Sequence, residues 1–196
     1  MNISEIDPLQ VRIPEYPVEP YILQRWSARA MSGEPLEHEQ LLRLFEAARW
    51  APSAANRQEW FFLFAHRETQ AFDQFFSLLD EGNRAWCQRA AVLIVVLART
   101  KTDTGRNIGT HAFDTGAASL NLAHQAIAMG LVVHPMAGFD TARTREELHV
   151  PQDFAILAMI AVGHPGEIED LPPHQQGRET PSLRNPVAHF IHEGAF

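Results

Sequence analysis

The sequence has almost no lysine, a single cysteine and no long apolar run. Lys101 is the only lysine among 16 basic residues, and 24 acidic residues outnumber them to give a formal net charge of −8. Proteins that bind nucleic acids or anionic membranes neutralise phosphates with clustered lysine and arginine. The charge balance therefore argues against both of these partner classes.

The lone cysteine and the short apolar runs exclude further classes. Cys87 cannot form an intrachain disulfide, and no zinc site with paired cysteines is present. It precedes an apolar run, which favours a small buried side chain. That run, Ala90 to Ala98, is the longest and is far too short to cross a bilayer. The first residues lack the basic and apolar regions of a signal peptide, so we expect a cytoplasmic protein.

What is present fits one globular domain with an arm at each end. The 196 residues are 45% apolar, which is enough for a substantial core. Residues 1–20 contain three prolines after position 10, and residues 187–196 follow a proline-rich stretch. Both ends are predicted to be extended arms around a domain at residues 21–186. Arms without a core of their own suggest docking on a second subunit.

Apolar spacing predicts both helices and strands within the domain. Helical spacing occurs in four segments, at residues 36–49, 68–80, 111–129 and 141–149. Continuous apolar runs predict four buried strands, at residues 60–65, 90–98, 131–135 and 154–162. This alternation predicts an α+β (α/β three-layer) domain. The longest helix carries small residues that permit close packing against another helix, namely Ala112, Gly116, Ala117, Ala118, Ser119 and Ala123.

Three polar segments are candidates for a binding site. In the first, an extended backbone would place Arg25, Ser27 and Arg29 on one side. Two guanidinium groups and a hydroxyl can hold a phosphate through charge-assisted hydrogen bonds. The alternative interpretation of this segment is a solvated surface turn.

The other two segments connect helices and strands. APSAANRQEW, at residues 51–60, combines small residues with the paired donors and acceptors of Asn56 and Gln58. Small residues let a flat ligand approach the backbone, although a plain connecting loop is the alternative. HPMAGFD, at residues 134–140, follows a strand, where ligands in open α/β sheets commonly bind. Ala137 and Gly138 leave backbone N–H groups accessible there.

Taken in order, these segments resemble the FMN-dependent nitroreductase family. The family pattern R-x-S-x-R is matched at residues 25–29, and A-P-S-x-x-N-x-Q-P-W is matched at residues 51–60. Further matches are G-F-D at residues 138–140, G-x-P-x-E at residues 163–167 and R-x-P at residues 184–186. The resemblance extends over roughly residues 21–190. Glu59 replaces the usual proline, Ala137 replaces an acidic residue of some members, and the substrate-covering insertion is reduced.

The resemblance implies a central, mostly antiparallel sheet flanked by helices, in a homodimer with exchanged terminal arms. Arg25, Ser27 and Arg184 would bind the FMN phosphate. Arg29 would lie near the N1–O2 edge of the ring, where a cation stabilises the anionic reduced flavin. Four residues would reach the flavin of the partner subunit: Pro52, Ser53, Asn56 and Gln58. At the end of the third strand, Pro135 would contact the cofactor, and Met136, Ala137 and Gly138 would line the ring and offer backbone N–H groups to N5 and O4.

The implied activity passes electrons from NADH or NADPH to a small organic acceptor, such as a nitroaromatic compound or a quinone, by a ping-pong mechanism. The flavin performs this chemistry, so no side chain is assigned as catalytic and no metal is expected. No G-x-G-x-x-G follows a strand, so the nicotinamide donor would bind only transiently. Two alternatives within the family are a non-catalytic flavin-binding or sensing protein and a flavin-cleaving or dehalogenating enzyme.

Overall fold

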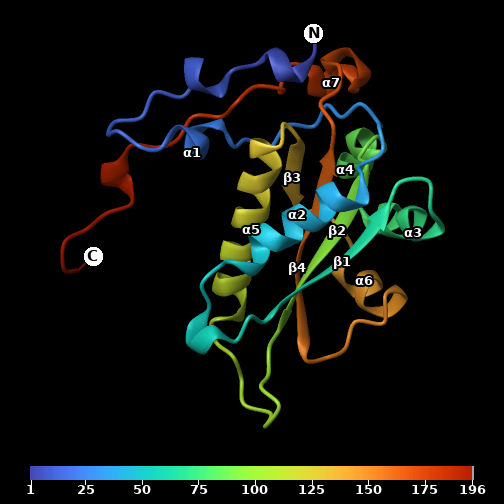
Figure 1. Ribbon diagram of the computed structural model, residues 1–196, viewed down its shortest axis with the longest axis vertical. Helices are drawn as coiled ribbons and strands as arrows, with labels where there is room; N and C mark the ends of the chain where they lie inside the picture. The colour runs from blue at the N-terminus through green and yellow to red at the C-terminus, as the bar shows by residue number, and fades with distance from the viewer. Residues whose placement is uncertain (196) are drawn as a thin grey trace.

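A four-stranded antiparallel sheet forms the centre of the protein in the computed structural model, which describes residues 1–195 (Figure 1). The strand order is β1-β2-β4-β3, with β1 at Trp60–His66, β2 at Val92–Arg99, β3 at Val132–Met136 and β4 at Phe154–Gly163. The helices that cover it are α2 (His38–Arg49), α3 (Gln70–Leu78), α4 (Glu81–Cys87), α5 (His111–Ala128) and α6 (Thr141–Glu147). None of the helices within residues 1–195 is both long and apolar enough to span a membrane.

Strand β2 explains the three layers, because it is buried on both faces. Successive side chains of a strand point to opposite faces. The even-numbered residues from Val92 to Val96 pack with α2 and α5, and the odd-numbered residues from Leu93 to Leu97 pack with α3 and α4. The α+β class predicted from the sequence is confirmed, and all three strand pairings are antiparallel.

Helix α4 was not predicted, because its seven residues contain a glycine and no apolar periodicity. The Asp80 side chain begins it by accepting a hydrogen bond from the Asn83 N–H at 2.9 Å. The helix then buries Trp86 and Cys87. Burial raises the pKa of the Cys87 thiol to about 12, so the prediction of a small core cysteine is confirmed.

Helix α5 ends where the sequence indicates. Gly130 has a φ of 70°, a left-handed conformation that glycine adopts without steric cost. The Leu131 N–H donates to the Ala126 carbonyl at 2.9 Å, which closes the last turn and directs the chain into β3.

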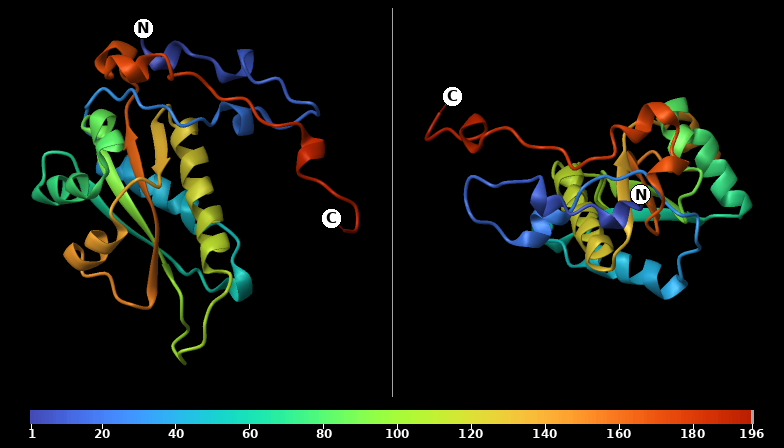
Figure 2. Two further views of the ribbon diagram at one scale, coloured as in Figure 1. Left: turned by 180° about the vertical axis from the view of Figure 1, so that it is seen from behind. Right: turned by 90° about the horizontal axis from the view of Figure 1, so that it is seen from above.

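The two ends of the chain run alongside one another, away from the sheet (Figure 2). The first dozen residues pack on their own chain, since Ile3 is buried in the core and Arg12 is 8% exposed. Residues 13–22 and 182–195 are exposed throughout and carry uncovered apolar side chains, including Ile13, Tyr16, Tyr21 and Phe190. The arm boundaries stay a prediction, and Phe196, which we expected to dock on a partner, lies outside the described residues.

Candidate functional site

Residues 25–30 leave helix α1 (Pro20–Gln24) as an extended segment beside β3. Trp26, Ala28 and Ala30 are buried, whereas the three intervening side chains, Arg25, Ser27 and Arg29, are half-buried. This alternation places the two guanidinium groups and the hydroxyl on one side, as the spacing predicts.

His134 ties this segment to β3, because its Nδ1 donates to the Ala28 carbonyl at 3.0 Å. The imidazole also packs on the Trp86 ring, with 4.6 Å between the ring centres. Burial is the main reason that the pKa of His134 falls to about 4, and the charges of Arg29 and Arg25 add to the effect. Hydrogen bonds with backbone groups of Ala28 and Ser27 oppose it. The imidazole is therefore neutral at pH 7.

Three guanidinium groups gather at the start of the segment, and we call Arg12, Arg25 and Arg184 the arginine cluster. Arg12 donates to the carbonyls of Ser182 at 3.0 Å, Leu23 at 2.8 Å and Arg25 at 2.7 Å. It thereby joins the C-terminal segment to the R-x-S-x-R segment. Its Nη2 is buried and has no hydrogen-bond partner within residues 1–195.

The arginine cluster holds like charges without a compensating carboxylate. Burial, followed by the charges of Arg184 and Arg25, lowers the pKa of Arg12, and burial followed by Arg184 lowers the pKa of Arg25. Across the described part of the chain, none of the three forms an ion pair. The Ser27 hydroxyl lies 3.4 Å from Arg25 Nη1 and adds a further donor. Because like charges repel, the cluster favours an anion with several oxygen atoms, such as a phosphate group.

Arg29 faces a carboxylate instead. The N–H groups of Arg29 and Ala30 both donate to Oε1 of Glu179, the second at 2.9 Å. Arg29 Nη1 lies 3.5 Å from Oε2 of the same residue, whose side chain is completely buried. Glu179 therefore fixes both the backbone and the side chain of Arg29. Glu179 was not predicted as a site residue, because a single glutamate in a polar tail carries no local signal.

The end of β3 presents backbone rather than large side chains. Met136 is buried in the core, so its side chain is not available to a ligand, whereas Pro135 and Ala137 are exposed. These residues adjoin His134 and therefore lie beside the Arg25–Arg29 segment. The structure thus brings together the first and third of the predicted segments.

Gly138 is fixed by contact with the start of α4. Its carbonyl accepts hydrogen bonds from the Asp80 N–H at 3.1 Å and from Asn83 Nδ2 at 2.9 Å. A Cβ at this position would clash with the side chains of Asp80 and Asn83, so a larger residue would displace the carboxylate that begins α4. Asn83 is a further polar residue at this end of β3 that the sequence analysis missed, because α4 itself was not predicted.

The loop between α2 and β1, residues 51–59, has an unusual backbone. Ala55, Asn56 and Gln58 have φ values of 53°, 52° and 54°. Left-handed conformations are uncommon for residues with a Cβ, and they cluster at ligand-binding sites. The side chains of Asn56 and Gln58 are exposed, as is Pro52.

Two contacts hold this loop in place. The Ser53 hydroxyl accepts the Gln58 N–H at 3.0 Å, and Asp114 Oδ2, in the first turn of α5, accepts the Ala54 N–H at 3.0 Å. Burial opposes ionisation of Asp114 most strongly. Hydrogen bonds from the Ala54 N–H, Thr110 and Glu59, with the charge of Arg57, outweigh it and lower the Asp114 pKa.

Glu59 takes part in the same anchor. Its side chain is buried, and its Oε1 accepts a hydrogen bond from the Thr110 hydroxyl at 3.3 Å. The residue that replaces the family's usual proline thus supports the loop from behind.

The R-x-S-x-R segment and the 51–59 loop do not meet within one chain. Tyr21, four residues before Arg25, packs on His124 of α5, with 5.1 Å between the ring centres. The loop is instead anchored at Asp114, in the first turn of the same helix. The helical rise between these two positions of α5 is about 15 Å. In Figure 1 the R-x-S-x-R segment and the loop lie at opposite ends of α5.

Known proteins resemble this chain over much of its length. The chain is 41% identical to an oxidoreductase containing FMN, with a TM-score of 0.91 over 94% of this chain and 96% of that one. It is 26% identical over 71% of its length to a Streptomyces coelicolor protein provisionally named NADH dehydrogenase/NAD(P)H nitroreductase, covering 78% of that protein.

A 15.4 kDa Mycolicibacterium smegmatis protein is 37% identical over half of this chain, and the match spans 65% of that protein's length. The model of the Nitroreductase family matches residues 22–75 and 64–164, which is more than half of the sequence. The chain therefore belongs to the nitroreductase family.

Proposed function

We propose that the protein is an FMN-dependent oxidoreductase that takes electrons from NADH or NADPH and passes them to a small organic acceptor. The arginine cluster carries this proposal. It brings together three guanidinium groups, none of which pairs with a carboxylate of residues 1–195, and the buried Nη2 of Arg12 has no hydrogen-bond partner there. A phosphate monoester supplies the charge and the oxygen atoms that such a cluster lacks. The similarity to an oxidoreductase containing FMN supports this ligand.

The R-x-S-x-R segment would bind both ends of the cofactor. Arg25, Ser27 and Arg184 would donate to the phosphate, with Arg12 behind them. Arg29, held by Glu179, would face the N1–O2 edge of the ring. When bound, FMN accepts and donates the hydride, and a cation beside N1 favours its anionic reduced form.

The end of β3 would lie along the ring. Pro135 and Ala137 are exposed there, and N–H groups of Met136, Ala137 and Gly138 would donate to N5 and O4. Their contribution is to orient the ring and to favour charge on it. Hydride transfer itself needs no side-chain acid or base, so we assign no catalytic residue.

We also propose that the enzyme is a homodimer with two FMN sites at its interface. The separation of the loop from the R-x-S-x-R segment supports a second copy that would complete each site. Pro52, Ser53, Asn56 and Gln58 would then reach the flavin of the partner. The apolar side chains that α5 and the arms leave uncovered support this assembly, notably Phe113 at 82%, Ile13 at 87% and Phe190 at 64% exposure.

The assembly is tested by light scattering and by a structure with FMN bound. We expect a dimer with an interface above about 2,000 Å². A monomer that holds FMN stoichiometrically would contradict it. So would a structure in which Arg25 and Asn56 of one chain contact the same flavin.

The activity is tested on the purified protein. We expect a flavin spectrum with one FMN per chain, and steady oxidation of NADH or NADPH with menadione or a nitroaromatic acceptor. Parallel double-reciprocal plots would support the ping-pong order. Bound flavin without turnover would favour a sensing protein, and fragments of FMN or released halide under oxygen would favour the flavin-cleaving or dehalogenating alternative.

A further inference from the structure

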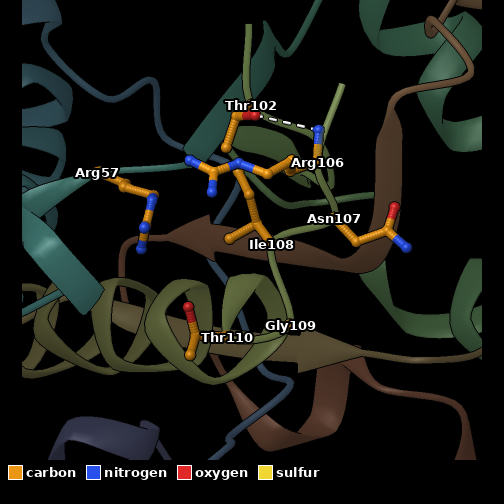
Figure 3. A pocket seen from close by; sticks show the side chains of 7 residues that line it. All are labelled: Arg57, Thr102, Arg106, Asn107, Ile108, Gly109 and Thr110. Carbon is orange, nitrogen blue, oxygen red and sulfur yellow. Dashed lines mark hydrogen bonds between the residues drawn. The ribbon is translucent and has the colours of Figure 1, made fainter. Parts of the chain in front are cut away.

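A cavity of about 300 Å³ lies between the 51–59 loop and the loop that joins β2 to α5. Figure 3 shows the side chains of Arg57 and Arg106 reaching towards one another from these two loops. Thr102 and Asn107 add a hydroxyl and an amide to its lining, so most of the polar groups are hydrogen-bond donors or can act as donors.

Neither guanidinium group at this cavity forms an ion pair within residues 1–195, although the charge of Arg57 acts on Asp114 behind the loop. Arg57 Nη1 donates only to the Ala54 carbonyl, at 3.0 Å, and the Arg106 side chain has no hydrogen bond or ion pair with any residue from 1 to 195. Arg99, which precedes the same loop, does pair with Asp103 at 2.9 Å. The cavity therefore carries surplus positive charge in a protein whose net charge is −8.

The start of α5 adds to this positive potential. Gly109 and Thr110 line the cavity at the N-terminus of this 18-residue helix. Thr110 precedes this helix without capping it: its side chain accepts no hydrogen bond from the first turn, while its hydroxyl donates to Glu59. The first N–H groups of a helix attract anions. The Glu59 and Asp114 carboxyls lie behind the loop and do not line the cavity.

The cavity adjoins the residues that would cover a flavin. Arg57 lies between Asn56 and Gln58, which reach the partner's FMN under the proposed function. A nicotinamide donor must dock at that flavin with its phosphates pointing outwards. We propose that Arg57 and Arg106 bind the phosphate groups of NADH or NADPH, an inference that rests on the proposed function. Positive charge at the entrance to the flavin site would raise the affinity for a donor that binds only transiently.

The test uses the dimeric, FMN-loaded enzyme and the variant Arg106→Ala, since Arg106 lies outside the flavin-binding loop. We expect KM for the donor to rise about tenfold, with kcat at saturating donor and FMN content unchanged. 1-Benzyl-1,4-dihydronicotinamide carries no phosphate, so its oxidation should be unaffected. Arg106→Lys should recover part of the loss. Arg43→Ala removes the same charge from the exposed face of α2 and should leave every KM unchanged.

Comparing NADH with NADPH identifies which phosphate group the two arginines bind. A rise in KM for both NADH and NADPH indicates the diphosphate, and a rise for NADPH alone indicates the 2′-phosphate; both support the proposal. Unchanged KM for both donors in an active variant, or an equal loss with the phosphate-free donor, overturns it. Failure of the wild-type enzyme to oxidise either donor would instead reject the proposed function, before any variant is examined.

Discussion

The arginine cluster and the 51–59 loop lie at opposite ends of α5 and are organised in opposite ways. The cluster is assembled from three distant segments, which Arg12 joins through carbonyl groups at positions 23, 25 and 182. The loop is a local structure that needs only its own residues and the first turn of α5. The cluster holds positive charges that repel one another, whereas the loop holds residues in a strained, left-handed backbone conformation.

This difference predicts how each region responds to ligand and to mutation. Charge repulsion in the cluster is relieved by an anion, so binding should stabilise the protein by mass action. Strain in the loop is not relieved by an anion, because hydrogen bonds inside the chain hold Ala55 and its neighbours; it is relieved by removing the Cβ of a left-handed residue. Substitutions at the two regions should therefore be distinguishable in the absence of any flavin.

The largest effect is expected for Arg12→Ala. It leaves three carbonyl groups without their charged donor and separates Arg184 from Arg25. We expect the apoprotein to lose about 3 kcal/mol of stability and FMN affinity to fall at least a hundredfold. Chemical denaturation and FMN titration measure the two effects. The exposed Arg178→Ala is the matched control, and an apoprotein as stable as wild type would refute the joining role of Arg12.

The cluster end should also be sensitive to acid, through His134. Its native pKa is about 4, while an unfolded histidine titrates near 6.5. Between these values the unfolded state binds a proton that the native state excludes, so stability falls as the pH drops. The total loss is about 3 kcal/mol and is complete below pH 4.

Urea denaturation of the apoprotein at several pH values measures this slope. His134→Gln should flatten the profile between pH 6.5 and 4, whereas the exposed His174→Gln should not. Identical slopes in wild type and His134→Gln would show that other groups dominate the acid response.

Arg25→Ala should separate ligand binding from stability. The loss of its charged hydrogen bonds should weaken FMN binding by about 1.5–3 kcal/mol for each bond removed. The apoprotein should be no less stable, since one of three repelling charges is gone. Fluorescence titration with FMN and thermal unfolding without it measure both. Unchanged FMN affinity would mean that the phosphate binds elsewhere.

Arg29→Gln should change the flavin rather than its affinity. Loss of the cation near N1 removes about 1.5–3 kcal/mol of support for the reduced ring, which corresponds to a potential lower by about 30–60 mV. Spectroelectrochemical titration of the loaded enzyme measures this shift. A potential that stays constant or rises would place Arg29 away from the N1–O2 edge.

The smallest effect is expected in the loop. Ala55 has a φ of 53°, so Ala55→Gly should stabilise the protein by about 1 kcal/mol by relieving strain. Ala54→Gly is the matched control, because Ala54 is not in the left-handed region and glycine there should destabilise. Thermal unfolding compares the pair. A loss of stability in both variants would show that the loop is not strained.

The sequence predicts those parts of the fold and site that depend on local periodicity. The alternation of Arg25, Ser27 and Arg29 with buried neighbours follows from residue spacing, and so do the four strands. Arg12 and Glu179 could not be found in this way, because each acts across the fold: Arg12 reaches Ser182, 170 residues further on, and Glu179 reaches Arg29, 150 residues before it. Asn83 was missed for another reason: α4 is a short helix with a glycine and no apolar spacing.

The contact between Arg12 and Ser182 also fixes when the anion site can form during synthesis. The strands and the helices of the core are complete once Gly163 has been added. Arg25 has then been present for most of translation. Arg184, and the segment at Ser182 that Arg12 binds, have not yet been made. Since chains fold progressively from the N-terminus as they are made, the core precedes the site. A nascent chain that stops before residue 182 would hold a folded sheet and no anion site.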